Sequence, residues 1–133
     1  MEWNISFDHA AIVTENTEKL RRVLKLLGLE DGGSELVASQ GVTTHFLRPN
    51  ARGKDELTCA QVEILEVADP QGTVAKFLSK KGPGVHHLSF RVSDIDRVCE
   101  HLKSNNIKLI YSEPREGAHS TRVNFIHPES TGG

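Results

Sequence analysis

Alternation of apolar and polar positions along the chain predicts short strands separated by helices. Residues 5–13 are rich in β-branched and apolar side chains, as is typical of a strand. In residues 14–28 apolar side chains recur at helical spacing, which predicts an amphipathic helix that ends at Gly28. Residues 31–49 contain turn residues followed by one or two strands, and residues 57–67 alternate well enough to form another.

The second half of the chain repeats this order of elements. A short amphipathic helix is predicted around residues 73–80, and the glycines and proline of "GPG" stop it. The stretch "GVHHLSFRV", residues 84–92, is then expected to be a strand. A helix is predicted over residues 93–106, with Ser93 or Asp94 as its N-cap. Strands are predicted over residues 107–114 and 122–128, with a loop between them.

An internal repeat organises these elements. An offset of 78 residues relates His9 to His87, Leu20 to Val98 and Leu24 to Leu102. An offset of 79 relates "HFLRP" (45–49) to "NFIHP" (124–128). Residues 1–133 are therefore interpreted as one α+β domain made of two tandem βαβββ units, about 5–67 and 84–133. Two such units packed together can close a shared site between their sheets.

Composition narrows the partners that the protein is expected to have. The net charge is −2, with no clustered basic residues of the kind that nucleic-acid-binding proteins carry. No apolar run approaches the length of a membrane span, and the N-terminus does not resemble a signal peptide. The isolated Cys59 and Cys99 are typical of reduced thiols, so a cytoplasmic location is expected, without nucleic acid or membrane partners.

The adjacent histidines of "GVHHLSFRV" raise the question of which one faces a site. Side chains on a strand alternate between its two faces, so His86 and His87 are not expected to point the same way. The repeat pairs His87 with His9, which selects His87 and leaves His86 a structural role on the opposite face. Glu63, flanked by apolar neighbours, is a candidate third ligand for a divalent metal. The alternatives are structural histidines and a solvent-facing glutamate.

Stretches that cover most of the chain, in order, resemble the methylmalonyl-CoA epimerase family of the vicinal oxygen chelate (glyoxalase/bleomycin resistance-like) superfamily. They are "DHAAIV", "SQGVTTHFL", "VEILEV", "TVAKFLSKKGPGVHHLSFRVSDID", "IKLIYSEPREGA" and "VNFIHPESTGG". The resemblance implies a cupped mixed sheet around a metal, with His9, Glu63 and His87 as its ligands. It also places a fourth ligand, a glutamate, in a strand after "STGG", so the last strand is expected to be missing from this sequence.

The resemblance further implies a reaction and its requirements. Methylmalonyl-CoA, an acyl-CoA, would be epimerised by proton transfer at its α-carbon through a metal-stabilised enolate. Cobalt is the favoured metal, with manganese, zinc, nickel or iron as alternatives. Thr44 stands where some family members carry a second glutamate and is expected to contact substrate. Ser89, two residues past His87 and so on the same face of the strand, is the other expected contact, and the catalytic base pair is unassigned. The resemblance also leads us to expect a homodimer.

Two other functions remain open at this point. A glyoxalase I-like lyase or isomerase would use the same metal ligands on a different substrate. A non-catalytic ligand-binding module of the same fold is the second alternative, and the missing fourth ligand is what suggests it.

Overall fold

The computed structural model describes residues 2–50 and 60–133. The chain divides into two compact units, Ser6–Arg91 and a second formed by Val92–Gly133 with the N-terminal residues up to Ile5. The start of the strand expected at residues 57–67, including Cys59, lies outside the described residues. The proposed repeat boundaries, about 5–67 and 84–133, stay a prediction.

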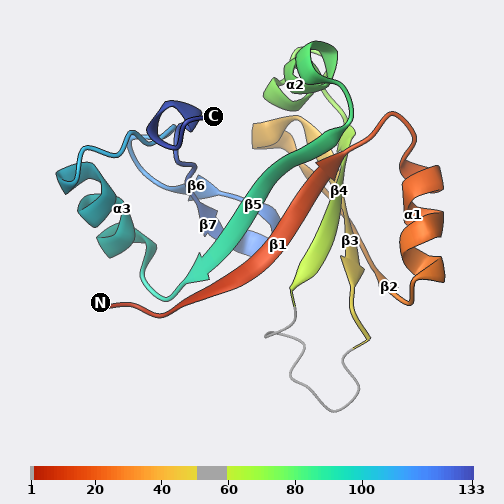
Figure 1. Cartoon of the computed structure of the whole chain (residues 1–133), viewed down its shortest axis with the longest axis horizontal. Coiled ribbons are helices and arrows are strands. Elements are labelled where there is room, and N and C mark those ends of the chain that lie inside the picture. Colours follow the sequence, from red (N-terminus) through yellow and green to blue (C-terminus); the bar gives the residue numbers. More distant parts are fainter. Residues whose placement is uncertain (1, 51–59) are drawn as a thin grey trace. The chain divides into compact units, whose positions relative to one another are not determined.

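A five-stranded mixed sheet forms the centre of the unit Ser6–Arg91 (Figure 1). Its strand order is β2-β3-β4-β1-β5. Strand β1 runs parallel to β4, whereas β3 is antiparallel to both β2 and β4. The strands are β1 (Ile5–Val13), β2 (Glu30–Val37), β3 (Val42–Arg48), β4 (Gln61–Val67) and β5 (Gly84–Val92). The predictions of strands at 5–13 and 84–92 are confirmed.

Helix α1 (Thr17–Leu26) has defined signals at both ends. The side chain of Asn16 caps its start by accepting a hydrogen bond from the Lys19 N–H at 3.0 Å. At the other end Gly28 adopts a φ of 105°, which only glycine reaches without strain. The N–H groups of Gly28 and Leu29 then bond back to the carbonyls of the last turn, as in a Schellman motif. The helix therefore ends at Leu26 with Leu27 as its C-cap, two residues before the predicted end, and Gly28 supplies the turn that follows it.

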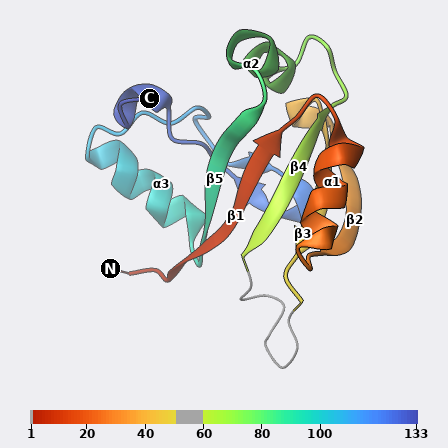
Figure 2. The same cartoon turned by 45° about the vertical axis from the view of Figure 1, so that its right-hand side comes forward.

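The two faces of the sheet bury separate apolar clusters. Helix α1 lies against one face of the sheet (Figures 1 and 2). There its Leu24 packs against Leu47 and Ile64, both fully buried. On the other, Val74 of α2 (Thr73–Lys81) packs against a cluster that includes Leu65. Burial of each such side chain contributes about 1.5–3 kcal/mol. Because Ile64 and Leu65 alternate between the two clusters, strand β4 has a fixed orientation, and Glu63 must share the face of Leu65.

The second unit contains helix α3 (Ile95–Ser104), whose start is capped by Asp94. The Asp94 side chain accepts a hydrogen bond from the Arg97 N–H at 3.1 Å, which confirms one of the two predicted caps. Strands β6 (Arg115–Glu116) and β7 (Arg122–Val123) pair in a short antiparallel ribbon. The prediction of a loop between residues 114 and 122 was therefore wrong in part.

The long strands predicted over residues 107–114 and 122–128 are also wrong in extent. Strand β7 ends at Val123, and further along the two segments an isolated bridge pairs Leu109 with Ile126. The side chain of Asn124 explains the interruption. Its Oδ1 accepts from the Tyr111 N–H at 3.2 Å, and its Nδ2 donates to the Tyr111 carbonyl at 3.1 Å. A side-chain amide thus takes the place of the backbone ladder at this point.

Loss of the Asn124 amide is expected to destabilise this unit. The variant Asn124→Ala leaves the Tyr111 N–H and carbonyl without these partners, and an unsatisfied, partly buried polar group costs about 1–3 kcal/mol. Urea unfolding should show this loss in the free energy of unfolding. Asn105→Ala is the matched control, because the Asn105 side chain donates to the exposed carbonyl of His101. Equal losses in the two variants would contradict the role given to Asn124.

Candidate metal centre

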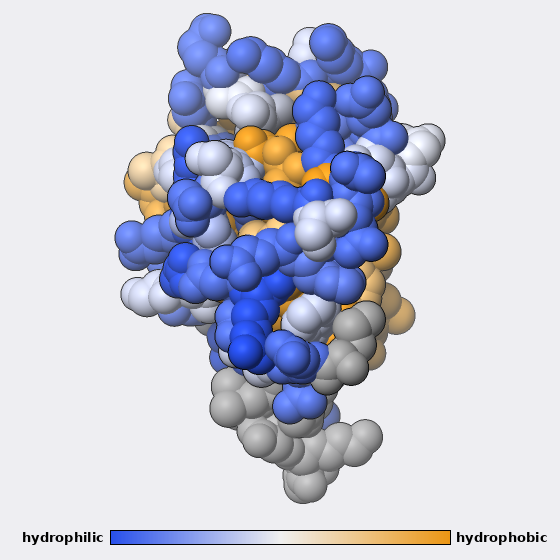
Figure 3. Space-filling view, turned by 90° about the vertical axis from the view of Figure 1, so that its left-hand side faces the viewer, coloured by the Kyte–Doolittle hydropathy of each residue, from blue (hydrophilic) through white to orange (hydrophobic). Residues whose placement is uncertain are grey.

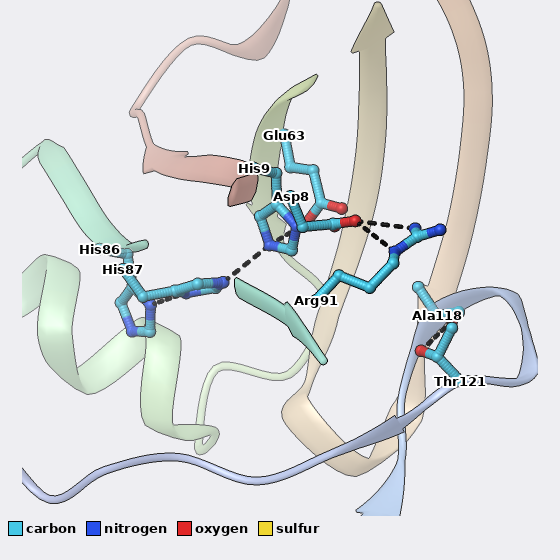
Figure 4. A network of polar contacts seen from close by, with 8 residues as sticks. All are labelled: Asp8, His9, Glu63, His86, His87, Arg91, Ala118 and Thr121. Carbon is cyan, nitrogen blue, oxygen red and sulfur yellow. Dashed lines mark hydrogen bonds and ion pairs between the residues drawn. The ribbon is translucent and has the colours of Figure 1, made fainter. Parts of the chain in front are cut away.

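Three side chains from three neighbouring strands converge on one point of the sheet (Figure 4). They are His9 of β1, Glu63 of β4 and His87 of β5, and one ligand atom from each lies within 4.8 Å of the other two. The Nε2 atom of His9 is 3.1 Å from Oε2 of Glu63 and 3.2 Å from Nε2 of His87. The structure therefore brings together the three residues that the sequence marked as candidate ligands.

The register of the sheet explains this convergence. In the parallel pairing of β1 with β4, His9 lies opposite Gln61 and Ala11 lies opposite Glu63. Glu63 is thus one side-chain repeat along from His9 on the same face. Its side chain is 12% exposed, so the alternative of a solvent-facing glutamate is wrong. Strand β5, on the other side of β1, supplies His87.

The outer nitrogens of both imidazoles also have partners. Nδ1 of His9 is 2.7 Å from Oδ2 of Asp8, and Oδ1 of Asp8 accepts from Nε and Nη2 of Arg91 at 2.9 and 2.7 Å. Nδ1 of His87 is 2.8 Å from Nδ1 of His86. The His86 ring packs edge-on against Phe77 of α2, with centroids 4.7 Å apart.

Sequence reasoning missed the contacts of Asp8 and Arg91 for a physical reason. The ion pair joins residues 83 positions apart, and no periodicity links them. The only local signal was the dipeptide formed by Asp8 and His9, because a carboxylate next to a ligand histidine is a common way to orient the ring. The expected structural role of His86 includes a direct contact with the candidate ligand beside it.

The electrostatics of the site suit a bound cation. Burial raises the pKa of Glu63, an effect that the neighbouring His9 opposes. Burial lowers the pKa of His87 to about 3, helped by the proximity of His86 and His9, so this ring is neutral near pH 7. The hydrogen bond from His9, together with Arg91, lowers the pKa of Asp8 and keeps it ionised.

This donor set fits a divalent transition metal. Neutral imidazole and carboxylate are the ligands that such ions take, and three protein ligands leave positions for substrate oxygens. A cation would also compensate the carboxylate of Glu63, whose ionised form is disfavoured by burial. The residues present therefore fit the metal that the sequence led us to expect.

Thr44 and Ser89 lie on strands that carry or flank the site. Thr44 pairs with Leu65 and so shares the face of Glu63, where it is 3% exposed. Ser89 is half-buried, two residues beyond His87 on β5. Their role as substrate contacts stays a prediction.

The low pKa of His87 predicts a pH-dependent stability of the metal-free protein. The unfolded chain takes up a proton near pH 6.5, whereas folded His87 resists protonation down to about pH 3. The free energy of unfolding should therefore fall as the pH is lowered through this window. Urea unfolding in the presence of a chelator should show a smaller fall between pH 7 and pH 5 for His87→Gln than for the wild type. Identical falls would contradict the assignment.

Comparison with known proteins places the chain in a family. Residues 8–125 match the sequence profile of the Glyoxalase/Bleomycin resistance protein/Dioxygenase superfamily. The mitochondrial methylmalonyl-CoA epimerase of Bos taurus is 31% identical, over 98% of this chain and 72% of that protein. The ethylmalonyl-CoA/methylmalonyl-CoA epimerase of Cereibacter sphaeroides is 30% identical, over 95% of this chain and 90% of that protein.

Solved structures agree with the sequence relatives. The crystal structure of methylmalonyl-CoA epimerase from Mycobacterium tuberculosis has a TM-score of 0.83 at 33% identity, covering 96% of this chain and 81% of that one. A methylmalonyl-CoA epimerase in complex with methylmalonyl-CoA has a TM-score of 0.86 at 27% identity, covering 96% and 88%. The predicted α+β, glyoxalase-like fold is confirmed, and the chain belongs to the glyoxalase/bleomycin resistance protein/dioxygenase superfamily, as a relative of its methylmalonyl-CoA epimerases.

Proposed function

We propose that this protein is an epimerase that interconverts the two epimers of methylmalonyl-CoA. The observation that carries the proposal is the convergence of His9, Glu63 and His87 on one face of the sheet, in a chain whose relatives are named methylmalonyl-CoA epimerases. A related epimerase structure contains methylmalonyl-CoA itself, which supports an acyl-CoA as the substrate class.

The chemical problem is an α-proton of low acidity beside a thioester carbonyl. A divalent cation, when bound, supplies Lewis-acid stabilisation of the negative charge that develops on oxygen. The part played by this chain is to hold that cation with His9, Glu63 and His87, and to keep His87 neutral by burying it. The apolar side chains of Ala11 and Leu65, which are buried on the same face, limit access of water.

The finer assignments are also proposals. Thr44 and Ser89 are the proposed substrate contacts, and the groups that move the proton are left unassigned. The donor set suits several ions, and cobalt is the one that the family resemblance favours, ahead of manganese, zinc, nickel or iron.

A homodimer in the cytoplasm is the proposed assembly and location. In support of a dimer, β1 and β5 expose apolar side chains. The rings of Phe7 and Phe90 are 5.8 Å apart and 43% and 57% exposed, and Leu88 is 59% exposed.

Hydrophilic residues cover most of the face drawn in Figure 3. Within residues 2–50 and 60–133, none of the helices has the length and apolar character needed to cross a membrane.

The activity is tested by following exchange of the α-proton of methylmalonyl-CoA with solvent deuterium. The cobalt-loaded protein should catalyse exchange, and His87→Gln should reduce kcat/KM by about 10²-fold or more, comparable to removal of an oxyanion donor. His101→Gln, which alters an exposed histidine on α3, is the control and should retain wild-type activity.

The outcomes separate the three candidate functions. Absence of exchange by the metal-loaded protein would sink the epimerase proposal. Turnover of a hemithioacetal substrate instead would identify a glyoxalase I-like lyase or isomerase. Binding of acyl-CoA without metal and without turnover of either substrate would identify a non-catalytic binding module.

A further inference from the structure

We propose that Asp8, held by Arg91, and His86 are positioning residues, each of which fixes the outer nitrogen of one ligand imidazole so that its Nε2 lone pair faces the metal position. The inference rests on the proposed function, because it takes His9 and His87 as metal ligands. It concerns three residues that do not themselves belong to the group of candidate ligands.

The arrangement behind His9 is a chain of charged hydrogen bonds. An ionised carboxylate only accepts hydrogen bonds, so the 2.7 Å contact with Oδ2 of Asp8 requires the proton of His9 to be on Nδ1. Arg91 occupies the other carboxylate oxygen, Oδ1, with two of its nitrogens. Oδ2 of Asp8 thus accepts from His9 while Oδ1 accepts from Arg91, and the Asp8 side chain is only 22% exposed.

The same ion pair ties together the two strands that carry the imidazoles. Asp8 lies on β1 beside His9, and Arg91 lies on β5, four residues beyond His87. The contact therefore limits sliding of β5 along β1, as well as rotation of the His9 ring. A charge-assisted hydrogen bond of this kind is shorter and stronger than a neutral one.

The arrangement behind His87 uses a neutral partner instead. Two imidazole nitrogens 2.8 Å apart share one proton, so either His87 or His86 carries it on Nδ1. Only with the proton on Nδ1 of His87 does its Nε2 keep a lone pair for a metal. The edge-on contact with Phe77 holds the His86 ring in the place where it can accept that hydrogen bond.

The contacts behind His9 and behind His87 are expected to contribute unequally to metal affinity. A carboxylate partner raises the basicity of a ligand histidine, and removal of an outer partner typically weakens metal binding by about 10–100-fold. A neutral imidazole partner should contribute less. Asp8→Asn is therefore expected to weaken cobalt binding more than His86→Phe, which removes the acceptor but keeps a ring to pack against Phe77.

The test measures the dissociation constant for Co²⁺ by competition with a chelator, together with the visible d–d absorption of the bound ion. Asp8→Asn should weaken Co²⁺ binding about 10–100-fold and shift the absorption bands. Arg91→Gln and His86→Phe should also weaken binding and shift the bands, but by less. Asp8→Glu, which restores a carboxylate, should recover part of the affinity.

Matched controls break a comparable ion pair elsewhere. Asp96 and Arg122 form a two-point pair at 2.8 and 2.9 Å in the other unit, so Asp96→Asn and Arg122→Gln should leave cobalt binding at the wild-type value. Circular dichroism of the metal-free variants establishes that each is folded, and Arg91, at 48% exposure, offers the substitution least costly to folding.

The outcomes distinguish this inference from the proposed function. Wild-type cobalt binding with unchanged affinity and spectrum in the Asp8, Arg91 and His86 variants would overturn the inference and leave the proposed function standing. Absence of cobalt binding by the wild-type protein would overturn both.

Discussion

The parallel pairing of β1 with β4 is the constraint on which the candidate site depends. It sets Ala11 opposite Glu63, and so places the Glu63 carboxylate one side-chain repeat from His9 on the same face of the sheet. A shift of one residue would turn Glu63 towards α1 and bring Ile64 to the site. The apolar clusters prevent that shift, because Ile64 is fully buried on the α1 side and Leu65 is buried on the other.

The same packing makes the site electrostatically unusual. Glu63 and His87 are removed from water, and burial disfavours the charged form of each side chain. Asp8 is different, because His9 and Arg91 stabilise its charge. The carboxylate of Asp8, outside the candidate centre, is therefore kept ionised, whereas the carboxylate of Glu63, inside it, is poorly solvated. Such a conflict with ordinary folding preferences is expected at functional sites, where binding of a cation can resolve it.

Much of the fold could be predicted from the sequence, because its signals are local. Apolar spacing, together with the terminal residues Gly28 and Asp94, predicts the helices, and these signals act within a few positions. The strands over 107–114 and 122–128 could not be predicted in extent, because a single amide, that of Asn124, competes with the backbone. Nothing in the apolar pattern distinguishes that amide from a neighbouring polar residue.

The candidate site also has residues that the sequence could predict and contacts that it could not. His9 and His87 could be found because the 78-residue offset relates them, and Glu63 because it interrupts an apolar strand. The partners behind these residues are set by tertiary contacts. Arg91 on β5 reaches Asp8 on the neighbouring strand β1, and the His86 ring nitrogen lies against that of His87. Alternation along a strand describes the direction of Cα–Cβ bonds, and it does not determine where a ring nitrogen at the end of a side chain lies.

The central claim is that His9, Glu63 and His87 bind a single divalent ion. Its most direct test is X-ray absorption spectroscopy at the cobalt edge of the protein loaded with one equivalent of Co²⁺. The account predicts a first coordination shell with two imidazole ligands, reduced to one in His87→Gln. A shell without imidazole, or one unchanged by His87→Gln, would contradict it.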